Sequence, residues 1–566
     1  MKVLKSFIFS AIISLVFVGC KSTIKTISVP EGSNEIINIS AKKGVLSDDE
    51  MHRWSHADLE KDSIPGISIV KAYQFLEGKK GVKVIVAIAD SGVDIDHEDL
   101  KNVTWINPNE IVGNNKDDDN NGYVDDVNGW NFLGNKEGKI VNADQLEITR
   151  IVKNGNEKFG NKKASEINEK DKVEFQKYLK LKEEYDKTIQ KNKEEIATLE
   201  GTLKRLNEIE ENFKVVRKLI GKENLILEDV EGLQPTSISL ATKISDVASL
   251  LSRGMKEKEL LKYKKEVVAY KEHLGKAQKG YDFNLNTRQS MGDDLYDISD
   301  KYYGNNNTIG SKELEMHGTH VAGIVAASRN NNKGVNGVAK NVKIMTVRVV
   351  PDGDEHDKDI ALGIRYAVDN GAKIINTSFG KRFSPNKEWV FEALKYAAEK
   401  DVLIVNAAGN DGKNIDIRQS YPSDTKDMLN EFTDNVITIG ASSLYYNEKL
   451  VATFSNYGKV NVDVFAPGVD IYSTVPKDEY EAVSGTSMAA PTVAGIAALI
   501  RSYYPQLSAN QVKKILMNSG VKINFDVIKP GTENEKVPFV DLSVSGRIVN
   551  AYNALKMANK MTKESK

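Results

Sequence analysis

Short apolar runs alternate with amphipathic segments through much of this chain. The apolar runs are dense in Val, Ile and Ala, as is typical of buried parallel strands. They lie at 82–89, 342–350, 373–377 and 402–405. Segments with apolar residues three and four positions apart follow at 359–370 and 388–399, and this spacing predicts helices. Because strands and helices alternate, we predict an α/β fold with a parallel sheet flanked by helices.

The segment 146–281 breaks this alternation. It is rich in Glu and Lys, and apolar residues recur at three- and four-residue steps: Phe175, Tyr178, Tyr185, Ile189, Ile196, Leu199, Leu203, Leu206 and Phe213. Two further helical patterns cover 238–251 and 257–274. These patterns predict an inserted, mainly helical, coiled-coil-like lobe. We expect its ends, near Asn142 and Tyr281, to lie close together, because the chain on both sides belongs to one domain. The lobe is either a solvated spacer or a lid or docking arm for a partner or substrate, and the sequence leaves both open.

The N-terminus has the features of an export signal. Basic residues in 1–5 precede an apolar stretch, 7–18, that is too short to span a membrane comfortably, and Gly19 and Cys20 follow. The segment resembles a bacterial lipoprotein signal, in which 1–19 is removed and Cys20 is lipidated. An ordinary signal peptide or an uncleaved anchor is the alternative. Lys21 stands where Asp often retains lipoproteins at the inner membrane, so we expect a cell-envelope protein at the outer membrane, facing the periplasm or the outside.

Composition limits the possible partners and covalent links. The chain has 566 residues and a formal net charge of −2, so its charge gives no indication of a nucleic-acid partner. Cys20 is its single cysteine, which makes an intrachain disulfide impossible.

Three short motifs supply an acid, an imidazole and a hydroxyl. Asp90 ends the first apolar run, His317 begins a small-residue helical segment, and Ser487 precedes an Ala-rich helix. In such a set the serine attacks, the histidine takes its proton and the aspartate orients the histidine. We expect Ser487 at a helix N-terminus, with Pro491 in the first turn, where proline needs no amide partner. Alone, each motif would be a turn, a helix cap or a buried histidine.

A fourth motif follows the apolar run 402–405. It reads Asn406-Ala407-Ala408-Gly409-Asn410, and a side-chain amide there can donate a hydrogen bond to an oxyanion. We assign this role to Asn410. Four motifs in one order, each at a strand end or a helix start, make four unrelated turns a poor explanation.

The four motifs resemble those of the subtilisin-like serine proteases, or subtilases, in which the order is also Asp, His, Ser. The resemblance covers 52–145 and 282–525 and implies a subtilisin-like parallel sheet flanked by helices, and endopeptidase activity on peptides or proteins. In that family, a segment such as 375–380 lines the substrate cleft. The residues implied for substrate binding are Ser378, Phe379 and Gly380 of this segment, with Ala408 and Gly409 from the small-residue wall of the pocket. The alternatives are a non-catalytic scaffold lipoprotein and an esterase-like hydrolase with the same triad.

The complete domain prediction follows from these boundaries. It is a signal peptide (1–19), an N-terminal lead-in (20–51), a catalytic domain (52–145 and 282–525), the helical insertion (146–281) and a C-terminal extension with a terminal helix (526–566).

An acidic loop lies between the first two motifs. Its oxygen-bearing side chains alternate around Gly122 as in the first part of an EF-hand loop. They are Asp117, Asp119, Asn121 and Asp125. The glutamate expected at position twelve is replaced by Asn128, and Asp126 could compensate. We predict structural Ca²⁺ here, as many subtilases hold surface loops with calcium, and a solvated acidic turn is the alternative.

Overall fold

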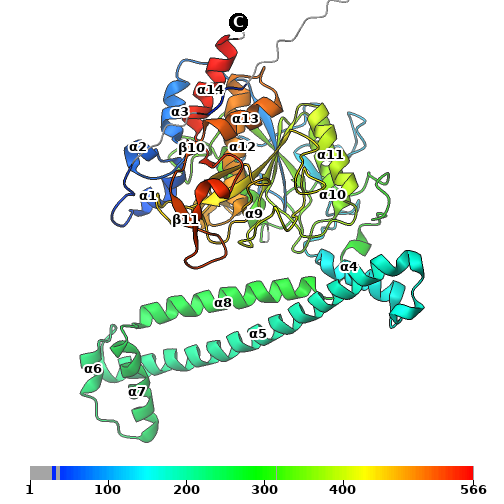
Figure 1. Cartoon of the computed structure of the whole chain (residues 1–566). Coiled ribbons are helices and arrows are strands. Elements are labelled where there is room, and N and C mark those ends of the chain that lie inside the picture. Colours follow the sequence, from blue (N-terminus) through cyan, green and yellow to red (C-terminus); the bar gives the residue numbers. More distant parts are fainter. Residues whose placement is uncertain (1–28, 33–38, 314, 565–566) are drawn as a thin grey trace, which may run out of the picture.

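The computed structural model describes residues 29–32, 39–313 and 315–564, and its centre is a nine-stranded sheet (Figure 1). The strand order is β10-β13-β7-β6-β5-β4-β1-β3-β2. Six central strands are parallel: β1 (Val84–Asp90), β3 (Val342–Arg348), β4 (Ile374–Thr377), β5 (Leu403–Ala407), β6 (Val436–Ser442) and β7 (Val464–Pro467). The edge strands are β2 (Gly129–Asn131) and β10 (Val521–Lys522); β13 (Arg547–Ile548) lies between β10 and β7, and within the described sheet only the β10–β13 pair is antiparallel.

Helices cover both faces of the sheet because successive strand residues point to opposite sides. Val84, Val86 and Ile88 belong to one hydrophobic core, whereas Ala87 and Ala89 belong to the other. The first core is shared with α3 (Ile69–Phe75), α9 (Met316–Ala326), α12 (Thr486–Tyr503), α13 (Ala509–Ser519) and α14 (Ala551–Glu564). The second is shared with α10 (Asp357–Asp369) and α11 (Lys387–Glu399). The predicted α/β architecture is therefore confirmed.

Smaller elements complete this domain. Two short helices, α1 (Asp48–Arg53) and α2 (Leu59–Asp62), precede α3. Two antiparallel hairpins lie outside the main sheet: β8 (Ile471–Val475) with β9 (Glu479–Val483), and β11 (Asp526–Ile528) with β12 (Lys536–Pro538). Among the residues that the structure describes, no helix combines the length and apolar character that crossing a bilayer requires.

The inserted segment forms an arm that projects from one edge of the domain (Figure 1). It comprises α4 (Glu147–Phe159), α5 (Lys172–Ile220), α6 (Leu227–Glu231), α7 (Ile238–Ser252) and α8 (Glu257–Gly280). One hydrophobic core lies at the base, between α4 and the start of α5, and a second lies at the tip, where α5 packs on α7 and α8. The helical patterns found in the sequence therefore correspond to helices α5, α7 and α8.

The two ends of the arm meet at the domain surface. The Leu146 amide donates a hydrogen bond to the Gly280 carbonyl at 2.9 Å, and Thr149 Oγ1 donates to the same carbonyl at 2.8 Å. Gln145 Nε2 donates to the Asp282 carbonyl at 2.8 Å. The expected closeness of the insertion's ends is thus confirmed.

Candidate active site

The three motifs meet at the carboxyl edge of the parallel sheet. Asp90 is the last residue of β1, His317 is the second residue of α9, and Ser487 is the second residue of α12. In open α/β sheets this edge is where ligand crevices form. Each residue type therefore lies where the sequence placed it: one at a strand end and two in the first turns of helices.

Asp90 and His317 form the closest polar contact of the site. His317 Nδ1 lies 2.7 Å from Asp90 Oδ1, which also accepts a hydrogen bond from the Ser91 amide at 2.8 Å. Asp90 is 1% exposed, and the His317 side chain is 37% exposed. Removal from water lowers the pKa of His317, but the attraction and hydrogen bond of the Asp90 carboxylate outweigh it, so the net pKa is raised. The carboxylate thus fixes the ring and favours its protonated form.

Ser487 contacts the segment that the sequence predicts to bind substrate. Its Oγ donates a hydrogen bond to the Ser378 carbonyl at 3.0 Å, and the described hydrogen bonds do not include one between Ser487 and His317. Catalytic hydrogen bonds in a free enzyme are often loose and tighten only with substrate.

Pro491 does not lie in the first turn of α12, which corrects the expectation from the sequence. The helix begins at Thr486, so Pro491 is its sixth residue, and no amide is available to the carbonyl of Ser487. Ser378 Oγ donates to that carbonyl instead, at 2.9 Å. Pro491 therefore leaves the Ser487 carbonyl free to accept a hydrogen bond from Ser378, which joins the backbone of α12 to the segment after β4.

Asn410 is held with its amide nitrogen available. Its Oδ1 accepts hydrogen bonds from Thr486 N and Thr486 Oγ1, both at 2.9 Å. Among the described residues, no acceptor binds its Nδ2. This nitrogen lies close to Gly485, since the position that a Cβ would occupy on that glycine is 3.6 Å away. Asn410 Nδ2 therefore lies close to the N-terminus of α12, and both groups favour negative charge.

A cleft of about 460 Å³ opens at Ser487. Phe379, Gly380, Gly409 and Asn410 line it, whereas Ser378 and Ala408 are buried behind its wall. The arm contributes residues that the sequence had not associated with the site: Leu146, Ile148, Glu184, Thr188 and Tyr281. These positions are up to 341 residues from Ser487 in the chain (487 − 146), and no local signal in the sequence connects them to it.

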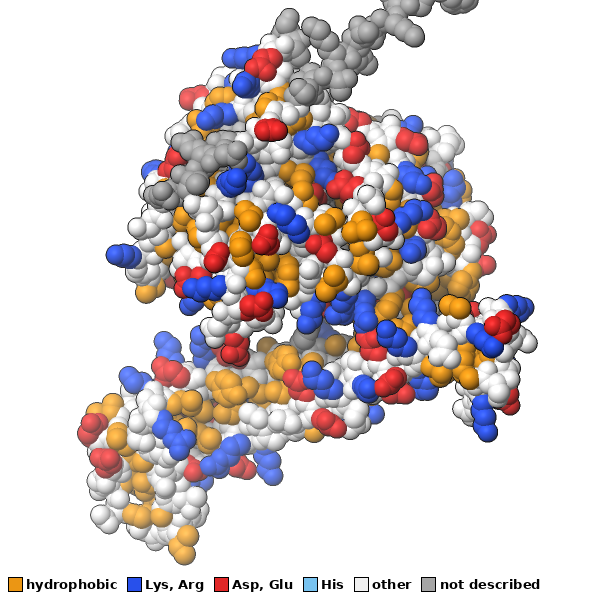
Figure 2. Space-filling view, in the orientation of Figure 1, with side chains coloured by type: hydrophobic (Ala, Val, Ile, Leu, Met, Phe, Trp, Pro, Cys, Tyr) orange, Lys and Arg blue, Asp and Glu red, His pale blue; other side chains and the backbone are white. Residues whose placement is uncertain are grey.

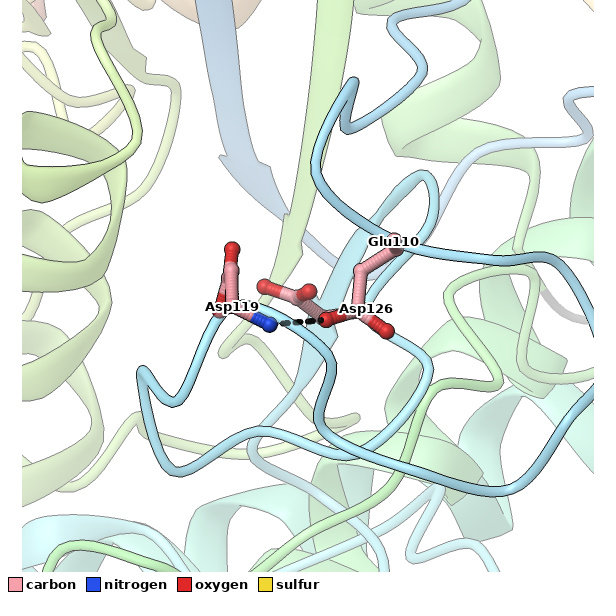
Figure 3. Close-up of side chains that lie close together, drawn as sticks. All are labelled: Glu110, Asp119 and Asp126. Carbon is pink, nitrogen blue, oxygen red and sulfur yellow. Dashed lines mark hydrogen bonds between the residues drawn. The ribbon is translucent and has the colours of Figure 1, made fainter.

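The acidic loop brings together a set of carboxylates that differs from the sequence prediction (Figure 3). Glu110, Asp119 and Asp126 each place one oxygen within 4.8 Å of the others. Burial raises the pKa of Glu110, and it raises the pKa of Asp126 to about 6. Glu110 Oε2 is buried, and no hydrogen bond from the described residues reaches it. Three oxygen donors, one of them unpaired, fit a hard cation such as Ca²⁺.

The other residues predicted as calcium ligands hold the loop's own backbone. Asp117 accepts hydrogen bonds from the amides of Asn121 and Gly122, and Asn121 Oδ1 accepts one from Tyr123. The Asp125 carboxylate accepts from the amides of Gly113 and Asn115. Of the four predicted ligands, Asp119 lies in the three-carboxylate cluster, together with Asp126, which the sequence offered as the compensating ligand. Glu110 was not selected because it precedes the acidic run. Cys20 lies outside the described residues.

The chain is similar in sequence to known proteases. The sequence profile described as the subtilase family matches residues 81–538. A thermophilic serine proteinase from Bacillus sp. (strain AK1) is 41% identical over 230 residues, which cover 40% of this chain and 48% of that protein. A cell wall-associated protease from Bacillus subtilis (strain 168) is 37% identical over 238 residues, covering 42% of this chain and 24% of that protein. Subtilisin DY from Bacillus licheniformis is 40% identical over 213 residues, covering 37% and 71%. The chain thus spans less than half the length of the first two relatives.

Proposed function

Because this chain belongs to the subtilase family, we propose that it is a serine endopeptidase whose catalytic residues are Asp90, His317 and Ser487. The 2.7 Å contact between His317 Nδ1 and Asp90 Oδ1 carries the proposal, and the position of Ser487 in the first turn of α12 supports it. Substrates would be peptides or proteins that enter the cleft at Ser487.

The reaction follows from the roles of these groups. Ser487 Oγ gives its proton to His317 Nε2 and attacks the peptide carbonyl, while Asp90 stabilises the imidazolium that forms. Asn410 Nδ2 and the N-terminus of α12 stabilise the negative oxygen of the tetrahedral intermediate. His317 then protonates the leaving amine, and the resulting ester on Ser487 is hydrolysed by a water that His317 activates. Low-dielectric surroundings strengthen each of these interactions.

Labelling with a fluorophosphonate tests the mechanism. Wild type should be labelled and should cleave casein, and Ser487→Ala should lose both properties with an unchanged circular dichroism spectrum. Ser484→Ala is a matched control, since Ser484 lies three residues away and, among the residues that the structure describes, its hydroxyl forms hydrogen bonds with Asp470 alone. Unaltered casein cleavage by Ser487→Ala would refute the proposal. Labelling with ester hydrolysis but no peptide cleavage would favour the esterase-like alternative, and absence of labelling would favour a scaffold.

We also propose that the acidic loop binds a structural Ca²⁺. The cluster of Glu110, Asp119 and Asp126 supports this, because a cation would offset the repulsion of three partly buried carboxylates. Bound ion stabilises the native state by mass action, by about 2.7 kcal/mol when its free concentration is a hundred times the dissociation constant. EDTA should therefore lower the Tm.

Two variants separate the candidate ligand sets. Glu110→Gln should abolish the difference in Tm between Ca²⁺ and EDTA if the cluster is the site, whereas Asp125→Asn should abolish it if the EF-hand-like set is the site. Glu137→Gln, at an exposed glutamate elsewhere in the chain, is the control. Equal Tm values in Ca²⁺ and EDTA for the wild type would leave the loop as a solvated acidic turn.

We propose further that the protein is a lipoprotein anchored through Cys20 in the cell envelope, at the outer membrane. The apolar stretch before the single cysteine supports this. Lipoprotein processing adds more than one acyl chain, and stable anchoring needs at least two such signals. Cys20→Ala should move the protein from the detergent phase to the aqueous phase and prevent labelling by a fatty-acid analogue. Retention of the variant in the membrane fraction would indicate an uncleaved signal helix.

A further inference from the structure

The base of the arm and the nucleophile share one cavity. The cleft of about 460 Å³ that contains Ser487 and Asn410 is also lined by residues from three parts of the insertion. Leu146 and Ile148 lie at the start of α4, Thr188 lies on α5 beside Glu184, and Tyr281 follows α8. The arm therefore forms part of the surface that a bound substrate would contact.

Apolar packing joins the arm to the segment that follows the substrate-binding residues. Phe383 comes three positions after Gly380 and packs against the core of the arm base. That core contains Ile148, Tyr185 and other residues of α4 and α5, with Leu146 and Tyr281 at its edge. The cleft wall and the arm core are thus one continuous apolar body.

Ion pairs also join the arm to the segment that follows Gly380. Lys381 Nζ lies 2.8 Å from Glu147 Oε2 of α4 and 2.9 Å from Asp357 Oδ1 of α10, and its side chain is fully buried. Arg382 pairs with Glu184 of α5 at the mouth of the cleft. Figure 2 shows apolar and basic side chains side by side where the base of the arm meets the domain. These contacts give the arm base a fixed position relative to Ser487.

We propose that the base of the arm determines substrate specificity, by forming the wall that contacts substrate side chains upstream of the residue at the cut. This inference rests on the proposed protease function, in which Phe379 and Gly380 line that side of the cleft. Leu146, Ile148 and Tyr281 are the apolar residues that the arm adds to a cleft whose other lining is largely polar, and the Glu184–Arg382 pair lies at its rim. The enzyme therefore selects peptides with apolar side chains two or more residues before the scissile bond.

The test compares two fluorogenic peptides with the same residue at the cut. The short peptide ends at that residue, and the long peptide carries three further apolar residues upstream. Thr188→Trp fills the cleft from an α5 position that is half-buried, so the variant should fold. Thr198→Trp is the matched control: it lies on the same helix, ten residues further on, makes the same hydrogen bond to the carbonyl four residues earlier, and does not line the cleft. Leu146→Ala has the opposite effect on the cleft: it removes part of the apolar lining, whereas Thr188→Trp adds side-chain volume.

Thr188→Trp and Leu146→Ala should each lower kcat/KM for the long peptide about tenfold or more, and change the value for the short peptide less than twofold. Thr198→Trp should change neither. Equal effects on the two peptides, or no effect on either, would overturn the inference. If the wild type cleaves neither peptide and resists fluorophosphonate, the protease function itself is wrong and the inference is overturned with it.

Discussion

Lys381 is the residue whose replacement should most sharply test how the arm is attached. Its ammonium group has no exposure to water and contacts Glu147, Asp357 and the Glu355 carbonyl, the last at 2.6 Å. Lys381→Met keeps the length of the side chain and removes the charge. Two buried carboxylates then lose their shared cation.

The expected loss of stability in Lys381→Met depends on the charges that stay buried after the lysine is removed. Removing one partner of a buried ion pair costs about 3–5 kcal/mol, because the other charge is left unpaired. Arg150 still contacts Glu147 at 2.7 Å, so we expect a loss near the lower limit, about 3 kcal/mol. For a domain of 150–250 residues such a loss lowers the Tm by roughly 6–12 °C, and by less in a larger one.

The stability lost in Lys381→Met should depend on pH. Burial alone would raise the pKa of Glu147, but Lys381 and Arg150 overcome this and hold it at about 2, below its ordinary value of 4.5. Stability from this pairing is therefore complete above pH 4.5 and declines as the pH falls toward 2. The difference between wild type and Lys381→Met should shrink over the same range, since protonation removes the unpaired charge.

The measurement is thermal unfolding in a Ser487→Ala background, which prevents self-cleavage, at fixed calcium concentration. Lys395→Met is the control, because Lys395 pairs with Glu392 in exposed positions and its loss should leave the Tm unchanged. A double-mutant cycle with Glu147→Gln isolates the pair. A loss below about 1 kcal/mol for Lys381→Met, or perfect additivity in the cycle, would refute the claim that this lysine holds the base of the arm to the domain.

Three further predictions follow from the site. Asp90→Asn should lower kcat by about four orders of magnitude and shift the acid limb of the pH profile of kcat/KM to lower pH, because His317 loses the carboxylate that raises its pKa; an unmoved limb would contradict this. Ser378→Ala should cost about 1–3 kcal/mol in urea unfolding, because the Ser487 carbonyl loses its donor, and unchanged stability would show that water replaces it. Replacing 150–278 with a short Gly/Ser linker should leave a folded protein that a fluorophosphonate still labels, since the ends of the arm adjoin; an unfolded product would show that the catalytic domain needs the arm.

Local features of the sequence predicted most of the fold. The apolar run that becomes β1 and the small-residue segment that becomes α9 carry their periodicity within a few residues, so Asp90 and His317 could be placed at a strand end and a helix start. The ends of parallel strands share one edge, which brings these residues together. Pro491 was misplaced by one turn because the sequence does not show that Ser378 supplies the missing donor.

Tertiary contacts account for what the sequence did not predict. Glu110 joins Asp119 and Asp126 through a loop closure that no spacing encodes. Lysine is usually a surface residue, so the sequence gives no reason to expect Lys381 to be buried. Its burial depends on Glu147 of α4 and Asp357 of α10. The wall formed by the arm depends equally on the folded position of an insertion that has its own periodicity and its own cores.

The continuity of α5 gives the arm a mechanical property. One unbroken helix of 49 residues carries Thr188 in the cleft wall and Phe213 in the distal core, about 38 Å apart at 1.5 Å per residue. Such a helix acts as a lever: a load applied at the far end produces torque at the wall. Gly201 lies between the two points with open space around it, and glycine is the residue that resists bending least. Gly201 is therefore the point along α5 where bending is easiest, midway between the distal core and the cleft wall beside Ser487.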